Sequence, residues 1–271
     1  MKKLGLALGA GGSRGVAHIG FLKALEEGGV KPSYICGCSM GSVVGAAYSA
    51  GLTPDQMWGI VQKLRLLDII SPSGQRGGLF GTKKMRQQLV KHLGDITFDD
   101  LKIPFHCVSV DMCTQKLIEF SSGSVVDAVV ASSSIPAIFH PLDKDGMRLI
   151  DGGILERVPV AQVKAMGADV VVAIDVLGQR DCSEDCPRVL GVLLETIDLM
   201  DNYRTLRRKE ENAEIIDFWL EPDLGSMSQY ELKQVSLAYQ KGYELGVEYL
   251  PAIKKALRAR KKRTKPKDGL I

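Results

Sequence analysis

Short apolar runs alternate with segments of helical spacing in the first fifty residues of the chain. Leu4–Leu8 is an apolar run that ends in glycines, a pattern typical of a buried strand entering a tight loop. Between Val16 and Glu27 apolar residues recur every three or four positions, which predicts a helix. The order repeats with a strand at 34–36 and a helix of small residues at 40–50. This alternation predicts a parallel sheet covered by helices.

Residues 52–100 interrupt the rhythm. Amphipathic segments at 57–67 and 83–93 lie on either side of a glycine-rich stretch at 73–81, and we interpret the whole region as a helical insertion. Strand patterns then return at 105–110, 117–120, 148–150, 170–176 and 215–220, and helical patterns at 124–131, 160–166, 189–213 and from about 230 into the C-terminal tail.

The net charge of +3 is unevenly distributed over the 271 residues. Nine of the 35 Lys and Arg residues lie between Lys254 and Lys267, which leaves 26 bases against 31 acids in residues 1–253, a net charge of −5. A folded nucleic-acid binder more often carries a basic face on the domain itself, so we expect no nucleic-acid partner. The basic tail could attract anionic lipid headgroups, or it could be a solvated helix end.

Six cysteines are present, but a chain of this length buries a core that needs no disulfides. Cys36 and Cys38 are expected to act as small apolar residues at a strand end, with their thiols reduced. Cys182 and Cys186 lie in an acidic loop without a nearby histidine, which disfavours a zinc site.

The N-terminus, Met1-Lys2-Lys3 followed by Leu4–Ala10, has the charged and apolar parts of a signal peptide. The apolar run is short and contains two glycines, so we interpret it as the buried strand. No stretch approaches the roughly 20 apolar residues that cross a bilayer. We expect a cytoplasmic protein, with membrane contact at most peripheral.

The strongest local signal for chemistry is Gly37-Cys38-Ser39-Met40-Gly41, between an apolar strand and a helix of small residues. A nucleophile elbow needs this context, because the serine backbone is strained and only small residues fit around it. The turn would lift the Ser39 hydroxyl to the carboxyl end of the sheet. The alternative is an ordinary Gly-Ser turn.

A second glycine loop, Gly11-Gly12-Ser13-Arg14-Gly15, joins the first strand to the first helix. Its backbone N–H groups could hold the oxyanion of an acyl-transfer intermediate. A dinucleotide loop is the rival interpretation, but it requires an acidic residue at the end of the second strand. The residues there are Cys36-Gly37-Cys38-Ser39, which disfavours a dinucleotide.

A nucleophilic serine needs a base, and no histidine follows residue 140. An α/β-hydrolase places its acid and then its histidine after the serine, so only His140 stays as an outside candidate. Asp151, in Leu149-Ile150-Asp151-Gly152-Gly153, ends an apolar strand and would lie at the carboxyl edge of the sheet. Burial or a direct hydrogen bond would have to adapt its pKa to act as a base. An Asp-Gly turn is the alternative.

Taken together, the glycine loop, the Ser39 pentapeptide and Asp151-Gly152-Gly153 resemble the three ordered motifs of patatin-like phospholipases, and the bacterial cytoplasmic branch is most similar. Residues 131–136, 139–141 and 167–176 also resemble that family, so the resemblance covers about residues 4–176. Ala10 departs from it, because the family's loop usually has another glycine there. Alanine tolerates fewer backbone conformations, which leaves the outermost loop donor in doubt.

The resemblance implies a three-layer α/β/α sandwich with a mainly parallel central sheet, and hydrolysis of acyl esters or phospholipids without metal or organic cofactor. By it, Ser39 is the nucleophile and Asp151 the proton acceptor of a Ser–Asp dyad, and Gly11, Gly12 and Ser13 supply backbone donors. We expect one hydrolase domain over residues 1–250, with the helical insertion at 52–100, and a basic tail at 251–271. A regulatory or lipid-binding protein on the same fold is the second function class. The oligomeric state stays open.

Overall fold

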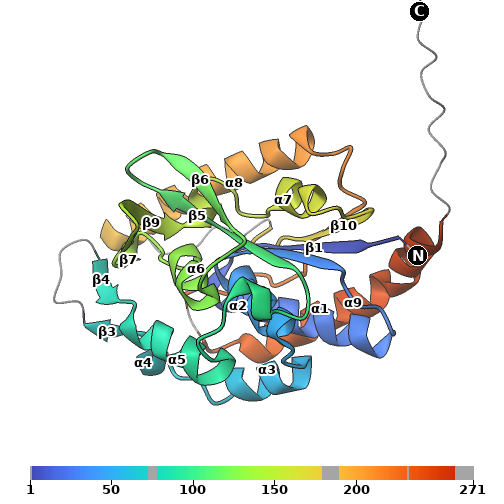
Figure 1. The fold of residues 1–271 in the computed structure, drawn as a ribbon, viewed down its shortest axis with the longest axis horizontal. Helices are drawn as coiled ribbons and strands as arrows, with labels where there is room; N and C mark the ends of the chain where they lie inside the picture. Colours follow the sequence, from blue (N-terminus) through green and yellow to red (C-terminus); the bar gives the residue numbers. More distant parts are fainter. Residues whose placement is uncertain (1, 73–77, 179–188, 231, 260–271) are drawn as a thin grey trace, which may run out of the picture.

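The structure is a computed structural model that describes residues 2–72, 78–178, 189–230 and 232–259. Within these residues the main sheet has eight strands in the order β11-β10-β1-β2-β5-β9-β8, with β6 paired to β5 beside this path (Figure 1). The strands are β1 (Leu4–Leu8), β2 (Tyr34–Cys38), β5 (Phe105–Asp111), β6 (Lys116–Phe120), β8 (Leu142–Lys144), β9 (Met147–Asp151), β10 (Val170–Ile174) and β11 (Phe218–Leu220).

Five neighbouring strands, β11, β10, β1, β2 and β5, run parallel to one another. β1 and β10 are buried along their whole length, as their uninterrupted apolar sequences predict for strands covered on both faces. The remaining strands of the sheet, β6, β9 and β8, are antiparallel to their neighbours. The sheet is therefore mixed, with a parallel half and an antiparallel half that meet at β5.

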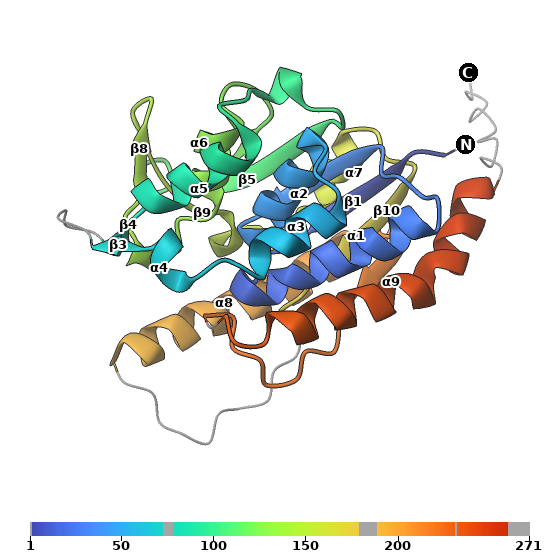
Figure 2. The same cartoon turned by 90° about the horizontal axis from the view of Figure 1, so that it is seen from below.

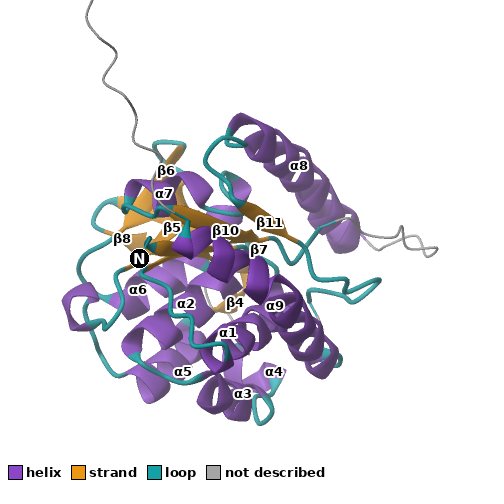
Figure 3. Ribbon diagram, turned by 90° about the vertical axis from the view of Figure 1, so that its right-hand side faces the viewer, coloured by secondary structure: helices purple, strands orange, loops and turns teal. Residues whose placement is uncertain are grey.

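Helices cover both faces of this sheet (Figure 3). One face carries α7 (Val160–Ala165) and α8 (Val189–Glu211). The other carries α1 (Ala17–Glu27), α2 (Met40–Ala50), α3 (Pro54–Val61), α4 (Leu66–Ile69), α5 (Lys83–Leu93), α6 (Val125–Ser132) and α9 (Val235–Arg258). Three short 3-10 helices complete the description: η1 (Gly12–Val16), η2 (Phe98–Asp100) and η3 (Gly152–Ile154). The predicted three-layer α/β/α sandwich is confirmed.

The C-terminal helix α9 lies side by side with α1 (Figure 2). Their backbones approach so closely that a Cβ on Gly242 would lie 1.9 Å from the Ala17 carbonyl oxygen. We predicted this helix from about residue 230, but it begins at Val235. The loop before it is held against the glycine loop, because its carbonyls at Gly225, Met227 and Gln229 accept hydrogen bonds from residues 13 and 14. Residues 260–271 of the basic tail lie outside the described residues.

The predicted insertion holds α3, α4 and α5 and a small second sheet that the sequence did not indicate. In it β3 (Ser71–Pro72) pairs with β4 (Gly78–Gly81), and β4 pairs with β7 (Ala137–Phe139). The amphipathic pattern at 57–67 is not one helix, because α3 starts earlier at Pro54, behind a capping box formed by Thr53 and Gln56, and ends at Val61.

Three of the six cysteines, Cys36, Cys38 and Cys107, are buried in β2 and β5 as free thiols, as expected of small apolar residues. Cys113 is free and exposed, and Cys182 and Cys186 lie outside the described residues. None of the helices in the described part of the chain combines the length and apolar character needed to cross a bilayer.

Candidate active site

Ser39 lies at the turn between β2 and α2 with φ 51° and ψ −122°, a left-handed conformation that is strained for a residue with a side chain. Glycines on both sides make the turn possible. A Cβ on Gly37 would lie 2.4 Å from the Gly41 carbonyl oxygen, and one on Gly41 would lie 2.1 Å from that of Leu8. The predicted elbow is therefore present, and helix α2 starts in contact with the end of β1.

Hydrogen bonds hold the strained serine in place. Its backbone N–H donates to the Ser132 hydroxyl at 2.9 Å, and its carbonyl accepts from the Ser42 hydroxyl at 2.6 Å. Ser132 ends α6, so the helix on the neighbouring strand fixes the elbow. The side chain of Ser39 remains available for other contacts.

Asp151 ends β9 and lies level with Ser39, but for a reason other than the one predicted. We predicted a strand end at the carboxyl edge of the sheet, and the structure shows that this strand, β9, is antiparallel to β5. The register decides its position: Cys38 pairs with Val108, and Asp151 pairs with the next residue of β5, Ser109. Because β5 lies between β2 and β9, residue 151 is level with the residue that follows Cys38.

The side chains of Ser39 and Asp151 lie close enough for the Ser39 hydroxyl to affect the pKa of the carboxyl. The Asp151 carboxyl accepts hydrogen bonds from the Gly153 N–H at 2.8 Å and from the Cys38 thiol at 3.7 Å. Only 4% of Ser39 and 5% of Asp151 is exposed. Burial raises the pKa of Asp151 to about 6, although the hydrogen bonds from Ser39 and Gly153 oppose the rise. A carboxylate with this pKa is a stronger base than an ordinary aspartate.

This pKa gives a testable pH dependence. If the Asp151 carboxylate accepts a proton during turnover, kcat/KM must fall as the carboxyl becomes protonated below about pH 6. With one proton involved, we expect about a tenfold decrease from pH 8 to pH 5. A pH-rate profile with a short soluble ester checks it. An acidic limb near pH 4, where ordinary aspartates titrate, would contradict a buried acceptor.

The glycine loop and the adjoining Ala10 lie against the chain neighbours of both residues. A Cβ on Gly15 would meet the Met40 side chain at 2.4 Å, and one on Gly153 would lie 3.5 Å from the Ala10 Cβ. Ala10, which stands where the family usually has a glycine, donates its N–H to the Arg157 carbonyl. This hydrogen bond joins the start of the loop to the segment that follows Asp151.

The backbone N–H groups of this loop are not equally available. The Ser13 N–H donates to the Gln229 carbonyl at 2.9 Å, so the predicted third oxyanion donor is already bonded in this structure. No described residue accepts a hydrogen bond from the N–H of Gly11 or Gly12. Gly12 has φ 51° and a Cβ there would lie 2.2 Å from the Gln229 oxygen, so glycine is required.

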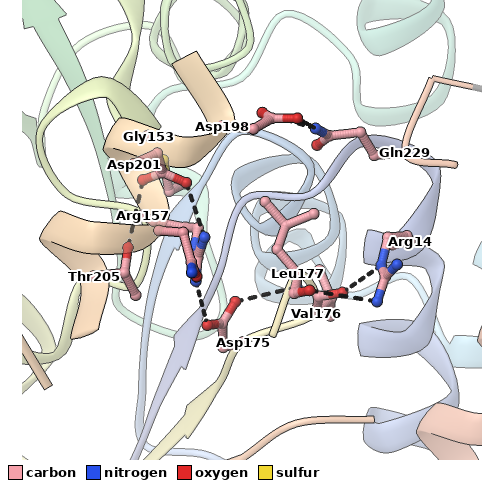
Figure 4. Close-up of polar contacts among 12 residues, drawn as sticks. Arg14, Gly153, Arg157, Asp175, Val176, Leu177, Asp198, Asp201, Thr205 and Gln229 are labelled. Carbon is pink, nitrogen blue, oxygen red and sulfur yellow. Dashed lines mark hydrogen bonds and ion pairs between the residues drawn. The ribbon is translucent and has the colours of Figure 1, made fainter. Parts of the chain in front are cut away.

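Two buried arginines join the segments around the candidate site (Figure 4). Arg14 donates to the carbonyls of Val176, Leu177, Gly225 and Met227, which joins the loop to the segments after β10 and before α9. The second arginine, Arg157, donates to the carboxylates of Asp175 and Asp201, at 2.6 and 3.0 Å.

Arg157 therefore ties the end of β10 to α8, and α8 contacts η3 directly after Asp151. The negative charge of Asp201 contributes to the raised pKa of Asp151. The pKa of Asp201 itself is raised to about 6, mainly by burial and against the attraction of Arg157. The position of α8, which carries Asp201, thus affects the pKa of Asp151.

The histidines lie apart from this pair. His18 is fully buried, its Nε2 lies 2.8 Å from the Gly9 carbonyl oxygen, and burial lowers its pKa to about 4. The outside candidate His140 bonds the Pro141 carbonyl through Nδ1. Within the described residues, no histidine forms a hydrogen bond with Ser39 or Asp151. A surface hollow of about 820 Å³ between α3 and α5, with His92 in its lining, does not include either residue.

The sequence model of the patatin-like phospholipase family matches residues 6–164, which is more than half of the chain. The chain belongs to the patatin-like phospholipase family. An uncharacterized NTE family protein of Mycobacterium bovis is 37% identical to this patatin-like chain over 183 residues, 66% of the chain and 50% of the relative. Lysophospholipase NTE1 of Coccidioides immitis is 28% identical over 286 residues, 93% of the chain and 18% of the relative.

The patatin-like chain thus spans half the length or less of these two relatives. Among solved structures, VipD from Legionella pneumophila is similar in fold, with a TM-score of 0.62 and 14% identity over 93% of this chain and 67% of that protein. This likeness supports the fold.

Sequence reasoning missed three contributors to the site: Ser132, Arg157 and Gln229. Ser132 lies in Ala131-Ser132-Ser133-Ser134, where a run of serines after an apolar helix was a usable signal. Arg157 follows Asp151 by six residues, between Glu156 and Val158, and an arginine in an apolar stretch could have indicated a buried ion pair. Gln229 had no signal, because it acts through its backbone carbonyl.

Proposed function

We propose that this chain is a serine acyl-ester hydrolase that acts on lipids through a dyad of Ser39 and Asp151. The observation that carries the proposal is a strained serine at a strand-to-helix turn, level with a buried carboxyl whose pKa is raised to about 6. A serine held in this way beside a base is the arrangement that nucleophilic catalysis requires.

In the first step the Ser39 oxygen attacks the ester carbonyl carbon while its proton passes to the Asp151 carboxylate. The oxyanion that forms would be held by the N–H groups of Gly11 and Gly12, at the start of the chain segment that leads into α1. Collapse of the tetrahedral intermediate expels the alcohol, which takes the proton from Asp151. The products of this step are the alcohol and an acyl-enzyme ester on Ser39.

In the second step water attacks the acyl-enzyme carbonyl while Asp151 accepts its proton. As the intermediate collapses, the bond to the Ser39 oxygen breaks and Asp151 returns the proton to that oxygen, which releases the carboxylic acid and the free enzyme. The names of the fungal relatives, lysophospholipases, support a glycerolipid ester as the substrate. We expect the reaction to take place in the cytoplasm at membrane surfaces, which the free thiols of Cys36, Cys38 and Cys107 support, since reduced cysteines are typical of that compartment.

A regulatory or lipid-binding role without catalysis is the competing function. A fluorophosphonate probe separates the two, because it phosphonylates only an activated serine. We expect one adduct, on the peptide that contains Ser39, and none in the Ser39→Ala protein. Labelling of the wild-type protein at another residue, or no labelling at all at pH 8, would favour the regulatory role. Incubation with a panel of phospholipids and lysophospholipids, with products identified by mass, would then define the substrate.

A further inference from the structure

Helix α8 presents an apolar face to the solvent. Its exposed apolar residues recur at intervals of one, three and six positions, which places them on one side of an α-helix: Val192, Leu193, Leu199, Met200, Tyr203 and Leu206. Leu199 is 70% exposed. The opposite side of the helix carries the buried polar residues Asp201 and Thr205, which face the Arg157 network (Figure 4). This distribution is the reverse of an ordinary surface helix.

A second exposed apolar edge lies at the same end of the molecule. The exposed fractions are 49% for Leu66 and 70% for Leu67 in α4, and 54% for Leu79 in β4. Figures 1 and 2 both show α4, β4 and the first turns of α8 at the end of the molecule toward which β1 runs. Exposed apolar patches on a protein mark interaction sites, and these two lie at one end of the molecule, one on each face of the sheet (Figure 3). We call α4, β4 and the outward side of α8 the apolar rim.

The apolar rim borders the candidate active site on two sides. On one side α8 contacts η3, immediately after Asp151. On the other, β4 pairs with β7 in the segment that follows Ser134, and the Ser134 carbonyl accepts the backbone N–H of Asp151. The apolar rim and the pair of Ser39 and Asp151 therefore lie at the same end of the molecule, the end toward which β1 and β2 run (Figure 1).

Positive charge adjoins the apolar side of α8. Met200, Tyr203, Arg204, Arg207 and Arg208 line a groove of about 490 Å³ together with Glu211. Arg207 is exposed, and no ion pair to it occurs among the residues that the structure describes. An arginine beside exposed apolar side chains suits a phosphate headgroup whose acyl chains lie against the apolar residues.

We propose that the apolar rim is the surface by which this chain binds an anionic phospholipid bilayer, so that lipid esters reach Ser39 from the bound face. The proposal rests on the proposed function, since it explains how an insoluble substrate reaches the site. A second copy of the chain fits the rim less well. In a two-fold symmetric contact the same face meets itself, arginines included, and the contact would cover the site.

The test measures binding to sedimented vesicles of phosphatidylcholine with phosphatidylglycerol, and to vesicles of phosphatidylcholine alone. Val192→Asp on α8 and Val247→Asp on α9 are a matched pair, because these valines are 50% and 49% exposed. Leu67→Asp tests α4, and Arg207→Glu tests the charge. Circular dichroism and thermal melting check that each variant folds, and sedimentation velocity gives its oligomeric state.

We expect Val192→Asp and Leu67→Asp each to weaken binding to the anionic vesicles by about tenfold or more. Each substitution replaces an apolar side chain that would be buried in the lipid by a charged one. Arg207→Glu should weaken binding to anionic vesicles only, and Val247→Asp should bind as the wild type does. Equal binding by Val192→Asp, Val247→Asp and the wild type would overturn the proposal. So would a dimer that Val192→Asp dissociates without loss of vesicle binding, which would make the rim an interface between copies.

The Ser39→Ala protein separates this proposal from the proposed function. It should bind vesicles as the wild type does and release no fatty acid. If it hydrolyses esters at the wild-type rate, the proposed function fails, whereas the vesicle results still decide whether the rim binds lipid.

Discussion

The Ser39→Ala and Asp151→Asn proteins are each expected to lose hydrolysis of a short chromogenic ester, by about 10⁴-fold or more in kcat. Alanine removes the atom that forms the acyl-enzyme. Asparagine keeps the size of Asp151 and can still accept from the Gly153 N–H, but it cannot take the serine proton at neutral pH. The two losses should be similar in size and the double variant no worse, because the pair acts as one unit.

Ser49→Ala is a matched control for the loss of a buried serine hydroxyl. Ser49 lies in α2, the helix that begins after Ser39, and no hydrogen-bond partner of its hydroxyl occurs among the described residues. Its replacement should leave kcat unchanged. Turnover by Ser39→Ala or Asp151→Asn within tenfold of the wild type would refute the assignment of that residue.

The Asp151→Asn protein should also be more stable than the wild type at pH 8. The folded-state pKa of Asp151 is raised above its ordinary value of 3.8, so the ionised carboxylate lowers the stability of the folded state. Asparagine removes that penalty, which corresponds to about 2–3 kcal/mol. The gain should be full above about pH 6 and vanish below about pH 4. Thermal melting across this range checks it and shows that the inactive variant is folded.

The second large effect is on stability. Arg157→Met is expected to lower the free energy of unfolding by about 3–5 kcal/mol at pH 8. The Arg157 side chain is almost fully buried between the carboxylates of Asp175 and Asp201, and its removal leaves two buried negative charges without a counter-ion. The loss should be smaller at pH 5, because protonation of Asp201, whose pKa is about 6 even beside Arg157, removes part of the charge.

Arg148→Met is the control for the loss of an arginine that is paired with an aspartate. Arg148 and Asp143 form an ion pair that is exposed on both sides, and the solvent screens such pairs, so little change in stability is expected. Urea denaturation of both variants at pH 8 and pH 5 makes the comparison. Equal stabilities of the Arg157→Met and Arg148→Met proteins would show that the buried network does not hold α8 in place.

Local pattern determined much of this protein. The predicted boundaries of β1, α2 and α5 agree with the structure, because each depends on residues within a few positions of one another: an apolar run ended by glycines, small residues after the elbow, and an amphipathic repeat. The conformation of Ser39 was predictable for the same reason, since the flanking glycines at 37 and 41 allow the turn. The resemblance to patatin-like phospholipases added the partner, Asp151.

Tertiary structure alone decided how these parts meet. Asp151 is level with Ser39 because of the register of an antiparallel strand, and strand direction leaves no trace in the apolar pattern of residues 147–151. The Ser13 N–H is bonded by the Gln229 carbonyl, a backbone group that every residue type carries. The apolar side of α8 faces outward because the opposite side of the helix, which carries Asp201, packs against Arg157. Sequence specifies contacts a few residues apart, whereas pairings between residues far apart in the chain depend on which surfaces pack together in the folded chain.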